Sequence, residues 1–270
     1  MSHEITTMVR MTSRIIDELD SLRPQSPDTL LSESLLLGFD TETTGLAAGN
    51  DAIVSASLVL RNPTTGFEGD LADSWLINPH RPISPGASAV NGLSDNYVAE
   101  HGSEPMPSLD AIADTIAAAQ RLRIPLVAYN APFDVRMLQG DLTRWRLRPL
   151  ESRIAPSAQR TGSGAPGTPL LIADPLVFDR ALSHRHGSHR LSATTEYYGI
   201  YPHGDFHDAS TDTVATLDLV GPMTRLYPQL AALSLGSLME WQTASFAQWK
   251  SSYNEWAKSN GRRPRTDTWF

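Results

Sequence analysis

The segment Leu35–Leu46 (LLLGFDTETTGL) carries the pattern from which the fold can be argued. Its first residues form an apolar run, which is typical of a buried β-strand. Asp40 and Glu42 lie two positions apart where this strand ends, and side chains with that spacing point to the same face of a sheet. Converging carboxylates repel each other unless a proton or a cation lies between them, and a hard cation such as Mg²⁺ prefers oxygen ligands. The segment therefore predicts a metal site at the end of a strand, although an exposed turn without function is the simpler alternative for one such motif alone.

A second acidic position follows another short apolar segment. Residues 126–129 (LVAY) predict a buried strand, and the chain continues directly into NAPFDVRML. Asn130 suits the N-cap of a helix, and Pro132 is tolerated in a first helical turn. Asp134 would then lie at the positive end of that helix, close to the end of the strand. A surface aspartate that only stabilises the helix start is the alternative.

A histidine and another acidic position occur together late in the chain. Residues 207–212 read HDASTD, and a helix is predicted from Asp208 towards Leu226. Asp212 would lie one turn inside this helix and His207 just before it, so both can face the same side. A histidine near a helix start is more often a cap or a surface group. The combination of all three motifs is what favours a functional site.

The composition limits the class of protein. The chain has 270 residues, 40% of them hydrophobic and 19% charged, which is ordinary for a globular protein. It has no cysteine, which excludes disulfides, thiolate zinc sites and cysteine nucleophiles. No apolar run approaches the ~20 residues that span a bilayer, and the N-terminus lacks the pattern of a signal peptide, so we expect a cytoplasmic protein without a membrane partner. A net charge of −8 excludes a basic nucleic-acid coat protein but is compatible with a nuclease whose site is built from carboxylates.

The remaining pattern predicts an α/β domain with helical additions at both ends. Closely spaced strand patterns favour an antiparallel meander at the start, and later strands alternate with helices. We expect further strands at 53–60, 73–77 and 170–174, and further helices at 84–90, 109–122, 175–183 and 191–198. We divide the chain into an N-terminal helix and linker, a core domain, and a C-terminal amphipathic helix with a basic tail, at residues 1–32, 33–227 and 228–270.

Taken in order, the three motifs resemble those of the DnaQ-like DEDDh 3′–5′ exonuclease family, which includes proofreading subunits and domains of DNA polymerases. The resemblance covers roughly residues 33–227. Shorter stretches are also similar to family segments, and they lie at residues 89–94, 174–176 and 191–199. The sequence departs from the family pattern at Asn91, where histidine is usual, and in the Gly-, Ser- and Pro-rich segment 151–169, which we expect to be a long loop.

The resemblance implies an RNase H-like fold. This is a mixed five-stranded sheet, an antiparallel meander plus parallel strands, flanked by helices and here extended by a C-terminal helix. It also implies two divalent metal ions, Mg²⁺ or Mn²⁺, that serve the attack of water on a phosphodiester, and a histidine as general base. The metal ligands would be Asp40, Glu42, Asp134 and Asp212, and the general base would be His207.

The resemblance further implies a pocket for the terminal nucleotide of a nucleic acid. The pocket residues would be Thr43, Thr44, Gly45, Leu46, Asn91, Asn130 and Phe133, with core packing as an equal alternative for Phe133. The expected reaction releases nucleoside 5′-monophosphates from the 3′ end of single-stranded DNA, in proofreading or repair, with a DNA polymerase or another replication protein as partner. A 3′–5′ exoribonuclease of the same family is the alternative.

Two other functions were weighed against this one. A phosphatase with an aspartyl-phosphate intermediate requires Asp-x-Asp and a lysine, but the second position here is Glu42 and the only lysines are Lys250 and Lys258 in the tail. A non-catalytic binding module or polymerase scaffold would be expected to have lost at least one motif position. All five are present, which favours an enzyme.

Two basic regions lie outside the motifs. Residues 184–190 (HRHGSHR) lack a spaced set of zinc ligands and favour a solvated loop that can contact phosphates. In the tail, aromatic residues between 241 and 256 recur at helical spacing. We expect that helix to pack against its own core, with partner binding or base stacking as less favoured alternatives. The arginines at 262–265 form a basic end that we expect to be disordered.

Overall fold

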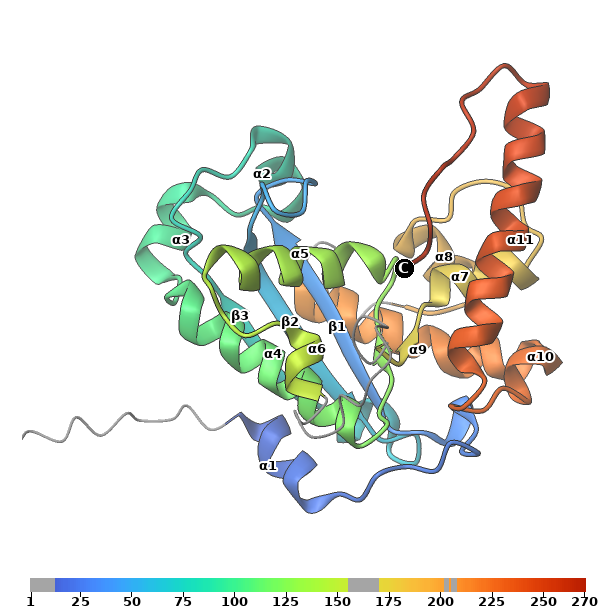
Figure 1. The fold of residues 1–270 in the computed structure, drawn as a ribbon, viewed down its shortest axis with the longest axis horizontal. Coiled ribbons are helices and arrows are strands. Elements are labelled where there is room, and N and C mark those ends of the chain that lie inside the picture. The colour runs from blue at the N-terminus through green and yellow to red at the C-terminus, as the bar shows by residue number, and fades with distance from the viewer. Residues whose placement is uncertain (1–12, 155–169, 202–203, 205–207) are drawn as a thin grey trace, which may run out of the picture.

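The structure, a computed structural model, describes residues 13–154, 170–201, 204 and 208–270. Its centre is a five-stranded sheet in the order β3-β2-β1-β4-β5 (Figure 1). The strands are β1 (Leu36–Thr43), β2 (Ile53–Arg61), β3 (Leu71–Leu76), β4 (Leu126–Val127) and β5 (Ile172–Ala173). The first three pair antiparallel, whereas β1–β4 and β4–β5 pair parallel. The predicted mixed sheet is therefore confirmed, with its two parallel strands, β4 and β5, shorter than the sequence pattern indicates.

Helices cover both faces of the sheet (Figure 1). One face packs against α9, which contacts β1, β2 and β3, while α4 and α5 lie on the other face with α1 beside them. The long and chain-terminal helices are α1 (Arg14–Ser21), α4 (Pro105–Arg121), α5 (Pro132–Arg144), α7 (Pro175–Leu182), α9 (Ala209–Leu226) and α11 (Leu238–Ser259). The shorter ones are α2 (Pro85–Asn91), α3 (Asp95–His101), α6 (Leu150–Ile154), α8 (Leu191–Tyr197) and α10 (Pro228–Ala231), with 3₁₀ turns at Leu31–Glu33 and Gly66–Gly69. Of these, α3 and α6 were not expected from the sequence.

The alternation along β1 divides its side chains between two cores. Leu37 and Phe39 are fully buried in the core that includes α1, α4 and α5, whereas Leu36 belongs to the core around α9. Successive side chains in a strand point to opposite faces, so Gly38, Asp40 and Glu42 share the α9 face with Leu36. Burial of the apolar residues of β1 thus determines that Asp40 and Glu42 point to the side of the sheet covered by α9.

The tail helix α11 packs against α7 and the β5 edge of the sheet, as predicted. Gln242 anchors it there: its side-chain amide donates to the carbonyl of Ile172 (2.7 Å), and its oxygen accepts from the backbone N–H of Asp174 (2.8 Å). None of the helices in the described ranges combines the length and the hydropathy needed to cross a bilayer.

The expectation of a disordered basic end is wrong. After α11 the chain turns back along the molecule, and Trp269 is only 4% exposed near its end. The backbone of Arg265 exchanges hydrogen bonds with the Asn254 side chain (2.7 and 2.9 Å), and the Lys250 ammonium donates to the carbonyl of Asp267 (2.8 Å). An apolar residue beyond the arginines therefore holds this end against the protein, a contact that the run of charges conceals.

Candidate active site

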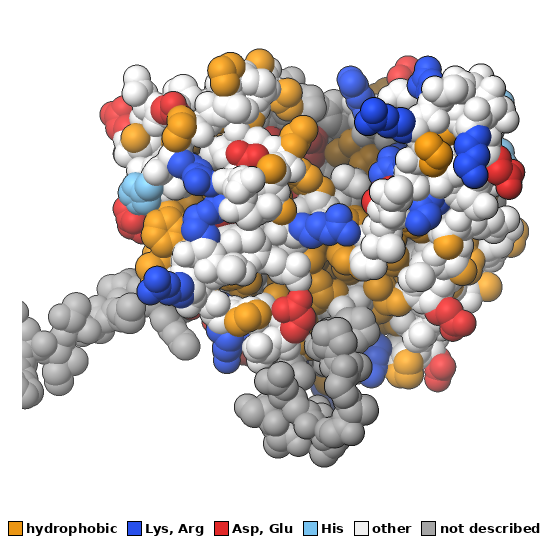
Figure 2. All heavy atoms as spheres, turned by 45° about the horizontal axis from the view of Figure 1, so that its top comes forward, with side chains coloured by type: hydrophobic (Ala, Val, Ile, Leu, Met, Phe, Trp, Pro, Cys, Tyr) orange, Lys and Arg blue, Asp and Glu red, His pale blue; other side chains and the backbone are white. Residues whose placement is uncertain are grey.

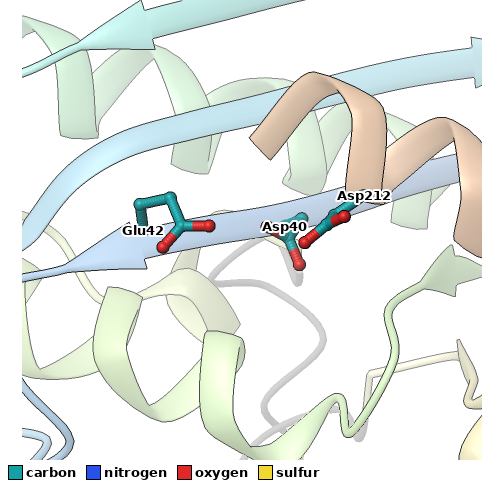
Figure 3. Close-up of side chains that lie close together, drawn as sticks. All are labelled: Asp40, Glu42 and Asp212. Atoms are coloured by element: carbon teal, nitrogen blue, oxygen red, sulfur yellow. The ribbon is translucent and has the colours of Figure 1, made fainter. Parts of the chain in front are cut away.

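The end of β1 and the start of α9 bring three carboxylates together. Asp40 and Glu42 project from the α9 face of β1, and Asp212 points towards them from the first turn of α9 (Figure 3). One oxygen of each of the three lies within 4.8 Å of the others. The convergence of Asp40 and Glu42 that the strand spacing predicts is observed, and the helix contributes the third carboxylate.

Gly38 sets how closely α9 approaches β1. A Cβ at this position would lie 2.6 Å from Cγ2 of Thr213 and 2.8 Å from Cδ1 of Leu217, closer than carbon atoms can pack. The helix itself begins at a well-formed cap, because the Asp208 carboxylate accepts from the backbone N–H of Thr211 (3.0 Å). The glycine thus allows the capped helix to rest on the strand backbone and brings Asp212 to Asp40.

The cluster is electrostatically unfavourable when it holds no cation. Burial, together with the charges of Asp134, Asp212 and Glu42, raises the pKa of Asp40 well above its usual range. Burial and the neighbouring carboxylates likewise raise the pKa of Glu42 to about 8. Clustered carboxylate oxygens are the ligands that hard divalent cations prefer, and a bound cation would remove the repulsion. The donor set therefore fits a divalent metal ion.

Asp134 lies beside this cluster on α5. Its side chain is 3% exposed, and one oxygen accepts hydrogen bonds from the backbone N–H (3.1 Å) and the hydroxyl (2.8 Å) of Thr41. Burial raises the pKa of Asp134 to about 7, although the hydrogen bonds from Thr41 act in the opposite direction. Asp134 is outside the three-carboxylate group. Its charge nevertheless contributes to the raised pKa of Asp40.

The turn between β4 and α5 differs from the prediction. Asn130 has a left-handed backbone (φ 65°) and does not cap α5, whose N-cap is Ala131 without a side-chain hydrogen bond. The backbone N–H groups of Asn130 and Ala131 instead donate to the two carboxylate oxygens of Asp174 (3.0 and 3.1 Å). The expectation that Asn130 is the N-cap is therefore wrong, because the buried carboxylate at the N-cap of α7, directly after β5, already accepts from these donors.

Of the predicted nucleotide-pocket residues, Leu46, Asn130 and Phe133 line one cavity of about 370 Å³. Leu46 is 85% exposed there, and Phe133 also packs on the core. Residues of the C-terminal segment, among them Arg265 and Trp269, also line this cavity.

The other predicted pocket residues shape the turn after β1. The Thr44 hydroxyl donates to Asp51 (3.2 Å), and the Thr43 hydroxyl donates to the carbonyl of Gly45 (2.7 Å). A Cβ on Gly45 would lie 2.6 Å from the Asp51 carboxylate, so a larger residue here would displace that side chain from its hydrogen bonds with Thr44 and Ala47. The side-chain amide of Asn91, at the end of α2, donates to the carbonyl of Thr43 (3.3 Å). A side-chain hydrogen bond between Asn91 and Glu42 lowers the pKa of Glu42, but burial raises that pKa by more.

Two predictions concern residues that the structure does not describe. His207, the expected general base, lies outside the described residues, as does most of the expected loop at 151–169. Of the third motif, 207–212, the structure describes the part from Asp208, the N-cap of α9, to Asp212 in its first turn.

The family of the chain follows from comparison with known proteins. The family model RNase_T, described as "Exonuclease", matches residues 37–220, which include β1, the β4–α5 turn and α9. The chain belongs to this exonuclease family. The resemblance to DnaQ-like exonucleases and the expected RNase H-like fold are thereby confirmed.

Relatives of this exonuclease-family chain have names from DNA replication. It is 32% identical to a "DNA polymerase III subunit epsilon-like protein" of Rhodobacter capsulatus over 77% of this chain and 26% of that protein. It is also 32% identical to "DNA polymerase III subunit epsilon" of Treponema pallidum, over 48% of this chain and 56% of that one. The fold is similar to that of E. coli exonuclease I in complex with a dA16 oligonucleotide, with a TM-score of 0.55 at 21% identity over 73% of this chain and 42% of that one.

Several residues around the site of this exonuclease-family protein have tasks that the sequence did not indicate. Asp174 belongs to the family-like stretch 174–176, but only the structure shows that it is 1% exposed and ties β4 to α5. A second cavity, of about 610 Å³, is lined by Asp212 together with basic residues, namely Arg180, His189, Arg190 and Arg265. Figure 2 shows a hollow between the part of the molecule that carries α2 and the part that carries α11, with Lys and Arg side chains along the α11 side.

The basic loop at 184–190 is mostly exposed, as predicted, but two of its side chains are anchored to the protein. Its Arg185 donates to the fully buried Asp179 carboxylate (2.7 Å), and Nδ1 of His189 lies 2.6 Å from the same group. Burial raises the pKa of Asp179, but these hydrogen bonds outweigh it and lower the pKa below its ordinary value. The ionised aspartate therefore fixes the loop and leaves Arg190 exposed at the second cavity.

Proposed function

We propose that this protein is a metal-dependent 3′–5′ exonuclease that removes nucleoside 5′-monophosphates from the 3′ ends of single-stranded DNA. The observation that carries the proposal is the group of three carboxylates, Asp40, Glu42 and Asp212, in a chain of the exonuclease family. The names of the polymerase III relatives and the oligonucleotide bound to the structurally similar exonuclease I support DNA as the substrate. By the same likeness, a DNA polymerase is the expected partner.

Each described residue of the site has a task in this proposal. Asp40, Glu42 and Asp212 would hold divalent metal ions, with Asp134 as an outer ligand. When bound, two such ions lower the pKa of an attacking water and neutralise charge that develops on the phosphate oxygens. Thr41 holds Asp134 by two hydrogen bonds, so this carboxylate keeps one orientation. Asn91 holds the end of β1 through the Thr43 carbonyl.

Two further tasks concern the substrate. Leu46 and Phe133 present apolar surface to the 370 Å³ cavity and would contact the base and sugar of the terminal nucleotide. By resemblance, an imidazole nitrogen of His207 would accept the proton of the attacking water, and an unperturbed histidine pKa of about 6.5 suits that step near neutral pH.

The test compares DNA and RNA strands of one sequence, each labelled either at the 5′ end or at the 3′ end. Cleavage is followed with Mg²⁺, with Mn²⁺ and with EDTA, for the wild type and for His207→Ala. We expect immediate release of mononucleotide from the 3′-labelled DNA, a ladder from the 5′-labelled DNA, no cleavage in EDTA and a large loss in the variant. A DNA strand blocked at its 3′ hydroxyl is the control and should resist cleavage.

Two results would change the proposal. Faster degradation of RNA than of DNA would assign the site to an exoribonuclease. No cleavage of either polymer with any metal would favour a non-catalytic module of the family.

A further inference from the structure

The C-terminal segment 261–270 is tied to the residues that position the candidate active site. The indole N–H of Trp269 donates to one oxygen of Asp174 (3.2 Å). This is the same carboxylate that accepts from the backbone of Asn130 and Ala131 at the start of α5. Arg136, on α5, also donates to the carbonyl of Trp269 (3.5 Å). The end of the chain therefore docks on the turn that leads to Phe133 and Asp134.

This segment forms part of both cavities beside the carboxylates. The 370 Å³ cavity is lined by Leu46 and Phe133 and also by Arg265 and Trp269. The 610 Å³ cavity contains Asp212 and again Arg265. Residues far beyond the family match at 37–220 thus complete the space next to the site.

Two guanidinium groups lie on one aromatic ring at the junction of these cavities. The guanidinium carbon of Arg180, on α7, is 4.1 Å from the centroid of Trp249, and that of Arg265 is 5.5 Å from the same centroid. Both arginines line both cavities. Stacking on an aromatic face holds an arginine in place while its N–H groups stay available for an anion.

The charge of this pair is only half compensated. Arg265 forms a bidentate ion pair with Asp267 (2.9 and 2.5 Å). Arg180 has no ion pair among the described residues, and its buried Nε has no hydrogen-bond partner there. Burial lowers the pKa of Arg180, and the nearby charge of Arg265 lowers it further, against the smaller opposite effect of the Asp174 and Asp179 carboxylates. A buried donor without a partner and two cations brought close together are both relieved by an anion with several oxygens.

Building on the exonuclease function proposed above, we propose that Arg180 and Arg265 bind a backbone phosphate of the nucleic-acid strand, and that segment 261–270 forms one wall of the strand's path. The terminal nucleotide would occupy the carboxylate site, so this phosphate lies on the 5′ side of the bond that is cleaved. Arg180 can present two N–H groups to two phosphate oxygens, Arg265 contributes the N–H groups that its ion pair with Asp267 leaves free, and neither reads a base from this position.

The experiment measures binding and cleavage separately. Binding of a fluorescein-labelled oligothymidylate is measured by anisotropy in EDTA at several salt concentrations, for the wild type, Arg180→Gln and Arg265→Gln. We expect each substitution to weaken binding roughly tenfold, the size of one lost charge-assisted contact. Each should also reduce the slope of log affinity against log salt by about 0.7, as for one phosphate on a single strand.

Arg262→Gln is the matched control. Arg262 lies in the same segment and stacks on a tryptophan of the same helix (5.1 Å to the centroid of Trp256), but it lines neither cavity. The Arg262→Gln substitution removes the same charge from the same segment, and we expect this variant to have the affinity and the salt slope of the wild type. Because Arg180 is half-buried, thermal melting is recorded for every variant, and Arg180→Lys provides a second variant that keeps the charge but loses the fork.

Two outcomes would overturn the phosphate site. The first is equal affinity and equal salt slope for Arg265→Gln, Arg262→Gln and the wild type. The second is tighter binding after replacement of Arg265, which would show that the segment obstructs the strand. Cleavage of oligothymidylate by the wild type with Mg²⁺ tests the exonuclease function itself. Its absence would reject that function, whereas loss of the binding effect alone would reject only the role of Arg180 and Arg265.

Discussion

The two charged regions of this molecule both force like charges together, but they are built in opposite ways. At the end of β1, carboxylates two strand positions apart are joined by Asp212 from a helix that rests on Gly38. At the tail, two arginines from distant parts of the chain share the ring of Trp249. The first region is fixed by regular secondary structure and the second by tertiary contacts. The comparison suggests that chemistry is placed on the rigid core and that affinity for the strand is added by the peripheral segment.

The largest effect is expected when the acidic region is broken. Asp212→Asn keeps the size of the side chain but removes one charge from the cluster, so cleavage with Mg²⁺ should fall on the order of 10³-fold or more. In EDTA the variant should unfold at the same temperature as the wild type or higher, because it relieves repulsion between carboxylates. Single-turnover cleavage and thermal melting measure the two quantities. Retained cleavage would contradict the assignment of Asp212 to the metal.

A smaller effect is expected from Gly38→Ala, which tests whether the glycine sets the site. The added Cβ meets Thr213 at 2.6 Å and must push α9 away from β1. We expect a loss of about 1–3 kcal/mol in the free energy of unfolding and a fall in kcat of roughly 10- to 100-fold, as Asp212 moves relative to Asp40.

Gly86→Ala is the control for that substitution. Gly86 lies in α2, and a Cβ there would meet no atom within 4 Å. Alanine favours helix by up to about 1 kcal/mol over glycine, so this variant should be as stable as the wild type or more stable. Equal losses in both variants would show that close packing at Gly38 is unimportant.

The two regions also differ in how far the sequence revealed them. The pairing of Asp40 with Glu42 could be predicted because strand alternation acts within a few residues. The approach of Asp212 could be expected only in outline, since the space that Gly38 leaves for Thr213 is a contact between distant segments. The basic end was misjudged for the same reason: its arginines indicate disorder, and the buried Trp269 that holds them is recognisable only beside Asp174.

Local helix signals failed where a distant group replaced them. Asn130 has a strong preference for N-cap positions, yet here it adopts a left-handed turn because Asp174 accepts from its backbone N–H. The sequence of the loop at 184–190 likewise could not show that Arg185 donates to the buried carboxylate of Asp179. In both cases a buried carboxylate from another element satisfies donors that a local pattern assigns to side chains nearby.

The acidic region should also make stability depend on pH in the metal-free protein. Glu42 ionises near its usual value of 4.5 in the unfolded chain but at about 8 in the folded protein. The folded state therefore holds its proton more tightly, and the contribution of Glu42 to stability is lost as the pH rises from about 4.5 to 8.

Glu42→Gln isolates this contribution. In EDTA, denaturant unfolding should show that the variant is more stable than the wild type at pH 8 and that the difference shrinks towards pH 5. Mg²⁺ should raise the stability of the wild type more at pH 8 than at pH 5, because the ionised form binds the cation. A wild type more stable than Glu42→Gln at pH 8 without metal would contradict the proposed repulsion.

The smallest effect, and the one that sharpens the comparison most, is expected from Trp269→Phe. Phenylalanine still places an aromatic ring at position 269, but it cannot donate the hydrogen bond to Asp174. The Asp174 carboxylate keeps its three backbone donors. We expect a loss of about 1 kcal/mol in the free energy of unfolding. Oligonucleotide affinity should change less than for Arg265→Gln, because contacts of Lys250 and Asn254 still hold the segment.

The exposed Trp256 offers the control for this substitution, since it is 47% exposed and Trp256→Phe should leave both quantities near the wild-type values. If Trp269→Phe weakened oligonucleotide binding as much as Arg265→Gln does, the hydrogen bond from Trp269 to Asp174 would be as important for binding as the charge of Arg265. The tail would then be coupled to the β4–α5 turn, because both depend on one carboxylate. A weaker effect would mean that the core positions the chemistry without the tail, and that the tail contributes only charge along the strand.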